Sequence, residues 1–383
     1  GIELNALINK RTTGMMNPQD AEKITQRTRD EFPEGIESYG TDALRFTFCA
    51  LASTSRDINF DLHRVAGYRN FCNKLWNAAR FVLLNVTDNS HVTAEKSLGI
   101  ADRWIMSRMQ QTVSSFESHL KTYRFDLCAQ TLYEFVWNEY CDWYLELAKP
   151  VLYSDNFSAA QKAGTSDTLI RVLDQMLRLL HPFMPYITEE IWQSVKPLSS
   201  VANKDGDLIV QSFPQLDESL KDTEADTVIN WLKSVVVGIR TIRSENNIAP
   251  SKPLEVLFSK GDETHRDMTN SQYNYLCKLA RLESINWLES GTPAPAAATA
   301  LAGDMEILIP MAGLIDKEAE LDRLNKEINK LSGEIKRLSG KLNNENFVAK
   351  APEAVVAKER ETLTEAERDL DKLQANKTQI ESL

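Results

Sequence analysis

Apolar residues recur at intervals of three and four over most of the first two hundred positions, which is the spacing of helices that bury one face. The stretch from 125 to 149 is apolar or aromatic around much of its circumference, as expected of a helix packed inside a bundle. Breakers such as Asn89-Ser90, Pro150 and the string from His181 to Pro185 separate the apolar segments. The pattern predicts a helical bundle over 63–197, with helices over 63–85, 101–121, 125–149, 157–181 and 184–196.

The first 62 residues lack this long period. Pro33-Glu-Gly35 and Tyr39-Gly40 are turn signals, and a helix is expected over 41–53 with Thr41 or Asp42 as its N-cap. We expect residues 1–62 to form a short mixed segment ahead of the bundle.

From Gly206 the helical spacing gives way to short apolar runs of the kind found in strands. Helices are expected between these runs at 223–246 and 264–282. The Gly- and Ala-rich stretch 291–303 is expected to be a low-complexity loop. Residues 198–312 are therefore predicted to form a small α+β module, whose strand-like runs are 208–210, 254–258, 285–288 and 305–309.

Residues 313–383 carry heptads. Seven apolar residues spaced alternately by three and four form one seam, made of Leu321, Leu324, Ile328, Leu331, Ile335, Leu338 and Leu342. A second, less regular series follows the turn-forming stretch 343–352 and is interrupted by Glu359 and Lys377. Two helices of about 40 Å, folded back as an antiparallel coiled-coil hairpin, fit this pattern. Taken alone, the heptads also fit a dimerisation helix.

The composition bounds the class of protein. A chain of 383 residues suits two or three domains, and 42% hydrophobic with 26% charged residues is ordinary for a globular protein in water. There is no signal-peptide h-region, no apolar run of about 18 residues, and no clustering of the five cysteines. We expect a cytoplasmic monomer with reduced cysteines and no membrane contact.

The formal charge of −11 rules out attraction of nucleic acid by the whole molecule, so any such binding needs a local basic patch. From Leu62 to Thr87 there is no acidic residue. Cations there suit phosphates, asparagines suit base edges and rings suit stacking. The candidate contacts are Arg64, Arg69, Asn70, Asn73, Lys74, Asn77, Arg80 and Phe81. Phe71, Leu75 and Phe81 also fit core positions, and Trp76 is expected in the core. An ordinary solvated helix face is the alternative interpretation.

Catalytic patterns are missing from the sequence. It contains no G-x-G-x-x-G after a strand, no Walker A loop, no H-E-x-x-H and no G-x-S-x-G. His181, before Pro182, fits a helix end better than a general base, and Glu189 with Glu190 fits the dipole at a helix start. The sequence therefore predicts binding surfaces without a catalytic or metal site.

Several strings along the chain carry a resemblance to known proteins. The stretches 40–46 and 56–61 resemble the segment after the catalytic domain of class I aminoacyl-tRNA synthetases for aliphatic amino acids. The strings Phe71-Cys-Asn-Lys-Leu-Trp-Asn77, 137–146 and 181–192 resemble landmark strings of that group's anticodon-binding bundle. The stretches 239–254, 309–318 and 347–353 resemble the valine enzyme in particular. Together these strings resemble the C-terminal half of bacterial-type valyl-tRNA synthetase.

This resemblance implies a mainly α chain that binds tRNA(Val), with the bundle at the anticodon and the arm at the outer corner of the tRNA. The arm cations expected near its tip are Lys336, Arg337, Lys341 and Lys350. The parent enzyme would join valine to tRNA using ATP with Mg. The family's HIGH and KMSKS strings and its editing domain do not occur here. We therefore expect a fragment that is inactive and cofactor-free without the catalytic and editing domains of its parent chain.

Two alternatives stay open. One is a helical scaffold that binds other proteins through its coiled-coil arm, which the acidic charge would suit. The other is a freestanding tRNA-binding factor.

Overall fold

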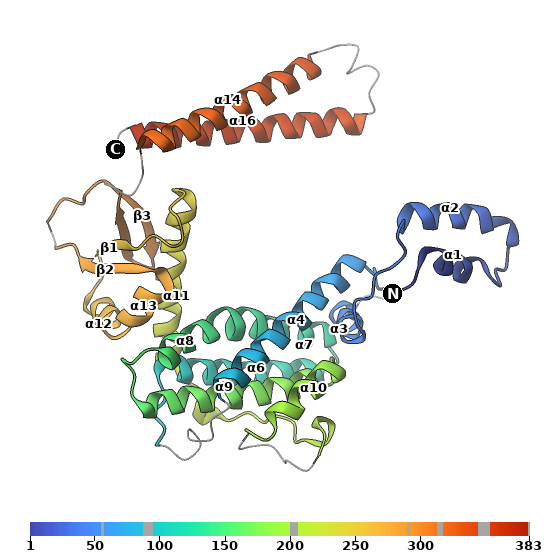
Figure 1. Cartoon of the computed structure of the whole chain (residues 1–383), viewed down its shortest axis with the longest axis horizontal. Helices are drawn as coiled ribbons and strands as arrows, with labels where there is room; N and C mark the ends of the chain where they lie inside the picture. Colours follow the sequence, from blue (N-terminus) through green and yellow to red (C-terminus); the bar gives the residue numbers. More distant parts are fainter. Residues whose placement is uncertain are drawn as a thin grey trace. The chain divides into compact units, whose positions relative to one another are not determined.

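The computed structural model describes residues 1–54, 57–86, 95–199, 206–289, 291–311, 317–343 and 353–381. They form a mainly helical protein with one four-stranded sheet in the C-terminal half (Figure 1). The chain divides into two compact units, Gly1–Asn230 and Trp231–Leu383, and the division falls inside the helix α11 (Thr223–Glu245). The helices and the small sheet confirm the predicted fold class, which is mainly α with a small α+β module. None of the helices in the described ranges has both the length and the apolar character that a membrane crossing needs.

Two helices that the sequence did not predict lie near the N-terminus, α1 (Leu4–Thr12) and α2 (Ala21–Glu31), with a 3₁₀ turn η1 (Pro18–Asp20) between them. α1 buries only Leu7 and α2 only Thr28. Because neither helix has a continuous buried face, the apolar period in their sequence is weak. A bridge between Ile2 and Ile36 closes the segment. Gly35 is required there, because its φ is 80° and a Cβ would collide with the backbone of Ile2.

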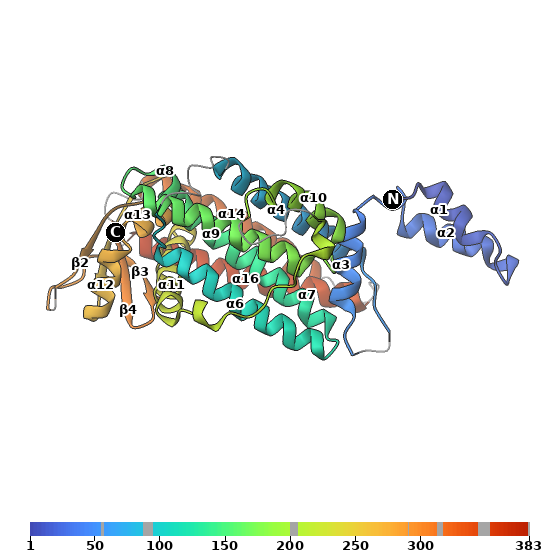
Figure 2. The same cartoon turned by 90° about the horizontal axis from the view of Figure 1, so that it is seen from below.

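The predicted bundle is confirmed (Figure 1, Figure 2). Apolar faces from successive helices meet in one core, whose largest fully buried side chains include Trp104, Trp192 and Tyr140. Its helices are α3 (Thr41–Leu51), α4 (Leu62–Asn85), α6 (Ile100–Lys121), α7 (Phe125–Glu134), α8 (Leu145–Tyr153), α9 (Ala159–Leu180) and α10 (Pro185–Val195).

The N-cap predicted for α3 is wrong. Gly40, with φ 87°, occupies that position, and neither Thr41 nor Asp42 caps the helix. Both lie inside its first turn.

Between α7 and α8 the chain forms a π-helix, η2 (Phe135–Tyr144), where the sequence predicted one uninterrupted helix. A π-helix is bonded from residue i to i+5, and such segments often occur at functional sites. Tyr140 and Tyr144 anchor η2, since their hydroxyls donate to Leu169 O at 3.2 Å and to Asp102 Oδ1 at 2.7 Å.

After the bundle, the run Leu208–Val210 forms a 3₁₀ turn, η3, so the strand predicted there is wrong. Three apolar residues are too few to distinguish a strand from a 3₁₀ turn, and Ile209 and Val210 are exposed. Another turn, η4 (Glu218–Leu220), leads into α11.

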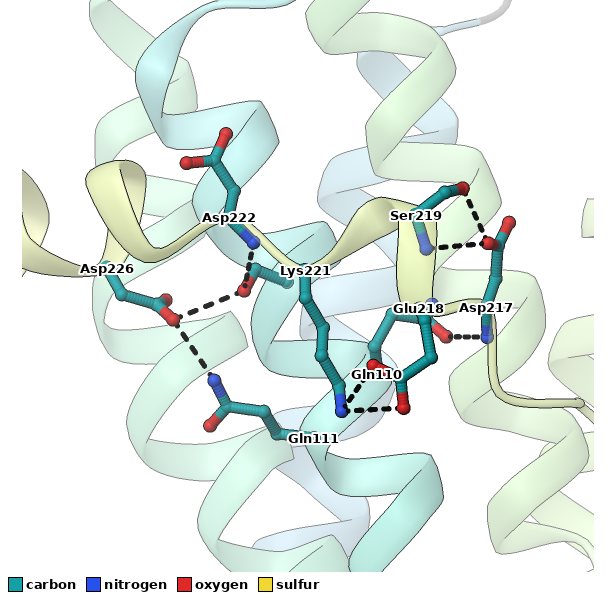
Figure 3. Close-up of polar contacts among 9 residues, drawn as sticks. Gln110, Gln111, Asp217, Glu218, Ser219, Lys221, Asp222 and Asp226 are labelled. Atoms are coloured by element: carbon teal, nitrogen blue, oxygen red, sulfur yellow. Dashed lines mark hydrogen bonds and ion pairs between the residues drawn. The ribbon is translucent and has the colours of Figure 1, made fainter.

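The segment that contains η4 is fastened along α6 by side chains of that helix (Figure 3). Gln110 Oε1 accepts from Asp217 N at 2.9 Å, and Ser107 Oγ accepts from Asp222 N at 3.0 Å. Asp226 Oδ2 in turn accepts from Ser107 at 3.2 Å and from Gln111 at 3.0 Å. The start of α11 therefore belongs with the bundle.

The second unit contains the sheet, with strand order β2-β1-β4-β3. β1 (Leu254–Ser259) pairs in parallel with β2 (Leu282–Trp287) and antiparallel with β4 (Met305–Pro310). The predicted loop 291–303 is wrong in part, because β3 (Ala297–Ala302) lies within it and pairs with β4. Its small side chains hid the strand signal. The helix predicted over 264–282 is two helices, α12 (Glu263–Ser271) and α13 (Tyr273–Ala280).

The C-terminal arm consists of α14 (Lys317–Leu342) and α16 (Glu353–Glu381), which pack along each other. Lys341 near the end of α14 forms an ion pair with Glu359 near the start of α16, which fixes the antiparallel direction. The predicted intramolecular hairpin is therefore confirmed. Leu338 is the most deeply buried described residue of the seam, at 2% exposure.

Candidate nucleic-acid interface

Helix α4 presents a polar face built from residues that the sequence singled out. Asp61 caps the helix by accepting from His63 N at 2.8 Å, and Phe71 and Leu75 anchor it in the bundle core. Asn70, Asn73 and Asn77 are exposed, as are Arg64 and Arg80. Because residues three and four apart share one side of a helix, the three amides form a row.

Two of the four α4 cations are paired with acids from other elements. Arg69 lies 3.6 Å from Glu37, and its guanidinium sits 5.2 Å from the ring centroid of Tyr39. Lys74 Nζ lies 2.5 Å from Asp142 Oδ1 and 3.9 Å from the ring centroid of Trp137. Within the described ranges, Arg64 and Arg80 form no ion pair. The positive charge most available to a ligand therefore lies toward the two ends of α4.

The aromatic residues of α4 differ from expectation in one case. Phe81 is half-buried, with Lys149 Nζ 5.8 Å from its ring centroid. Trp76 is 42% exposed, so the core position expected for it is wrong. Leu75 already occupies the core side of the helix, and the next residue along points about 100° away from it.

Sequence reasoning missed an aromatic surface beside Arg64. Tyr133 stacks on Trp137, with centroids 5.5 Å apart and planes at 17°. A hollow of 240 Å³ is lined by Arg64, Gly67, Tyr68 and Tyr133. The available signal was the spacing of Tyr133 and Trp137 by four, which places two large rings on one side of a helix.

The arm cations have different surroundings. Lys336 is exposed, Arg337 lies 3.8 Å from Glu334, and Lys341 pairs with Glu359. Lys350 lies outside the described residues. The arm therefore offers Lys336 and Arg337 to a ligand more readily than Lys341.

Burial shifts the pKa of three groups in the bundle that could take part in proton transfer or nucleophilic attack. Burial raises the pKa of Cys72 and of Cys141 to about 12, so both are thiols at neutral pH. Burial lowers the pKa of His181, whose Nδ1 lies 2.8 Å from Thr188 Oγ1. In the part of the chain that the structure describes, no three His, Cys, Asp or Glu side chains are arranged to hold a metal ion.

Comparison with protein families gives two matches. Residues 102–258 match the anticodon-binding domain of tRNA ligases, and residues 316–381 match the valyl-tRNA synthetase tRNA-binding arm. The first match includes Tyr133, Trp137 and Asp142 and begins after α4. The chain thus combines an anticodon-binding domain with a valyl-type arm, and it belongs to the aminoacyl-tRNA synthetases as the tRNA-binding, C-terminal portion of valyl-tRNA synthetase.

Proposed function

We propose that this chain holds tRNA(Val) for the catalytic and editing domains of its parent enzyme, and that it does not aminoacylate tRNA by itself. The observation that carries this proposal is the row of exposed amides at Asn70, Asn73 and Asn77, with Arg64 and Arg80 at its ends and the Tyr133–Trp137 stack beside it. Single-stranded RNA is recognised by this combination of amides, cations and rings.

Each group has a distinct role in the proposed complex. Arg64 and Arg80 contact phosphates of the anticodon loop, which positions the RNA without reading its sequence. The asparagine amides donate to and accept from base edges. The hollow beside Tyr133 takes one unstacked base against the tyrosine rings, while Phe81 is a second surface for stacking.

The arm supplies a second contact with the RNA. Two contacts fix the orientation of a bound RNA more strongly than either contact alone. Once the bundle has bound the RNA, binding by the coiled-coil arm is an intramolecular step. Lys336 and Arg337 are the proposed phosphate contacts of the arm.

The chemistry belongs to the parent. ATP with Mg and the valine pocket lie in its catalytic domain, and we expect this chain to act as a cytoplasmic monomer that binds no cofactor. The described residues support this assignment with a binding surface and with unreactive thiols.

Equilibrium binding tests the proposal. The affinity of the chain for tRNA(Val) and for a tRNA of another specificity is measured across a series of salt concentrations. We expect tRNA(Val) to bind more tightly, and Arg64→Gln and Arg80→Gln each to flatten the salt dependence by about one ion. Lys260→Gln is the control, because Lys260 pairs with Glu306 in the other unit. Equal binding of both tRNAs, or none at low salt, would contradict the proposal.

A further inference from the structure

The π-helix η2 places two residues on Lys74 that an α-helix would separate. Trp137 and Asp142 are five positions apart, and both contact the Lys74 ammonium, at 3.9 Å from the ring centroid and 2.5 Å from Oδ1. Residues i and i+5 are adjacent on a π-helix because its hydrogen bonds connect them. On an α-helix, at about 100° per residue, they would point about 140° apart. The π-geometry therefore accounts for the clamp around Lys74.

Contacts with other helices of the bundle also hold η2 in place. Glu139, also in η2, accepts two hydrogen bonds from Arg108 of α6, at 2.8 Å and 2.7 Å. Together with the hydroxyl bonds of Tyr140 and Tyr144, this holds η2 to α6 and α9. Asp142 is therefore presented to α4 by a segment with several independent anchors.

The clamp lies in the middle of the proposed RNA-binding face. Lys74 comes one residue after Asn73 and three before Asn77, and its side chain is 25% exposed. The Asp142 side chain is 47% exposed, so solvent and a ligand can both reach the carboxylate. A phosphate approaching this face would meet a paired lysine together with an accessible negative charge.

We propose that Asp142 competes with RNA phosphate for Lys74, so that this carboxylate sets the strength of the central contact on the α4 face. The inference rests on the proposed function. In the unbound chain the pair is neutral and the ammonium also lies against Trp137. When RNA binds, a phosphate oxygen replaces the carboxylate at Lys74 Nζ and Asp142 turns to water. No covalent bond changes in this exchange.

This competition makes the free energy of binding less favourable for every RNA. The free energy gained from the phosphate contact is offset by that of the broken pair, so Lys74 adds little affinity of its own. At the centre of this face an RNA must then gain its affinity from the amides and rings, which read bases. Asp142 thus lowers the affinity for cognate and non-cognate RNA by the same factor and leaves the discrimination between them to those base contacts.

A double-mutant cycle tests this mechanism on the whole chain. Binding of a tRNA(Val) transcript and of a non-cognate transcript is measured across salt for Asp142→Asn, Lys74→Gln and the double variant. We expect Asp142→Asn to tighten binding of both RNAs, by roughly two- to fivefold at low salt, and to steepen the salt dependence by about one ion. Lys74→Gln should weaken binding, because it leaves the Asp142 carboxylate unpaired on the RNA-binding face, where it repels phosphate. The double variant removes this charge as well and should return to within about twofold of the original affinity.

Matched controls separate this mechanism from loss of structure. Asp167 forms a similar pair with Lys96 at 2.6 Å without involving α4, and Asp167→Asn should leave binding unchanged. Thermal unfolding of each variant verifies that the bundle is intact. If Arg64→Gln and Arg80→Gln weaken binding while Asp142→Asn does not tighten it, the competition is refuted and the proposed function stands. If the unsubstituted chain binds neither RNA, both proposals fail.

Discussion

The carboxylate of Asp42, in α3, accepts a 2.7 Å hydrogen bond from the backbone N–H of Ile187, in the first turn of α10. Its other oxygen accepts from Tyr186 N at 3.3 Å. Met184, at the N-cap position of α10, offers no capping side chain, so a residue far away in the sequence performs this role. The contact joins the first helix of the bundle to the last and places a negative charge at a helix N-terminus.

Replacing Asp42 with Ala should therefore loosen α10. Two backbone donors would lose their acceptor, and we expect a loss of about 1 to 2 kcal/mol in the stability of that helix end. Hydrogen exchange at the amides of Tyr186 and Ile187 measures it directly. Asp30→Ala is a suitable control, because the one side-chain hydrogen bond that Asp30 accepts within the described residues comes from exposed Gln26. Equal protection in both variants would show that the cap does not stabilise α10.

Asp102 should make the bundle more stable in mild acid. Burial raises the pKa of this carboxyl to about 6, although hydrogen bonds from Tyr144, Gly99 and Thr165 oppose the rise. The folded pKa exceeds the ordinary value near 4, so the stabilising contribution is complete below about pH 4 and is lost as pH rises through about 6. Because one pKa unit corresponds to about 1.4 kcal/mol, the expected change is about 3 kcal/mol.

Comparison with Asp102→Asn isolates this dependence. The amide cannot ionise, so the difference in unfolding free energy between the two proteins should change between pH 4 and 6. Exposed carboxyls whose pKa is lowered, such as Asp217 and Asp262, cancel in this difference. A difference that is constant with pH would rule out titration of Asp102 in this range.

Arg243 should be essential to the α+β module. Its guanidinium donates to four backbone carbonyls, and burial lowers its pKa with a smaller effect from Arg281. The acceptors, at 2.8 to 3.2 Å, are the carbonyls of Ala249, Lys252, Ala280 and Arg281. Replacement by Ala would remove these four hydrogen bonds, at a cost of about 3 kcal/mol, although Ala249 O and Arg281 O would still accept from the amides of Lys252 and Leu254. Lys would restore only part of this, because it lacks the planar fork.

Exchange of the sheet amides measures this effect within the second unit. Arg266→Ala is the control, since that guanidinium lies 4.5 Å from the Trp287 ring centroid, and loss of this cation–π contact should cost about 1 kcal/mol or less. Similar losses for both arginines would contradict the structural role given to Arg243.

The parts of the fold that the sequence predicted are those set by local periodicity. The spacing of Phe71, Leu75 and Val82 defined α4 and its core side, and an unbroken heptad seam defined α14. Where side chains were small or the apolar run was short, as in β3 and η3, the local signal failed. The π-helix was missed because a period of three and four does not distinguish it from an α-helix.

The sequence predicted which α4 residues are candidates for the interface, but not which residues of other elements contact them. Exposure of the α4 amides follows from the helical period, but the partners of Arg69 and Lys74 come from other elements and depend on tertiary structure. The same is true of Asp42, which looked like a cap for its own helix and caps another. Charge counted along one segment therefore overstates the charge that the folded surface presents.

The arm should respond in opposite directions to two nearby substitutions. Leu338→Ala would empty the most buried described position of the seam, at a cost of about 2 to 4 kcal/mol. A Cβ added at Gly333 meets no described atom within 4 Å, so Gly333→Ala should stabilise α14 by about 0.5 to 1 kcal/mol. Far-UV circular dichroism during thermal unfolding would follow the arm. If the arm orients tRNA as proposed, Leu338→Ala should also weaken tRNA binding while the bundle amides keep their protection. Loss of arm structure with unchanged affinity would show that the bundle alone holds the RNA.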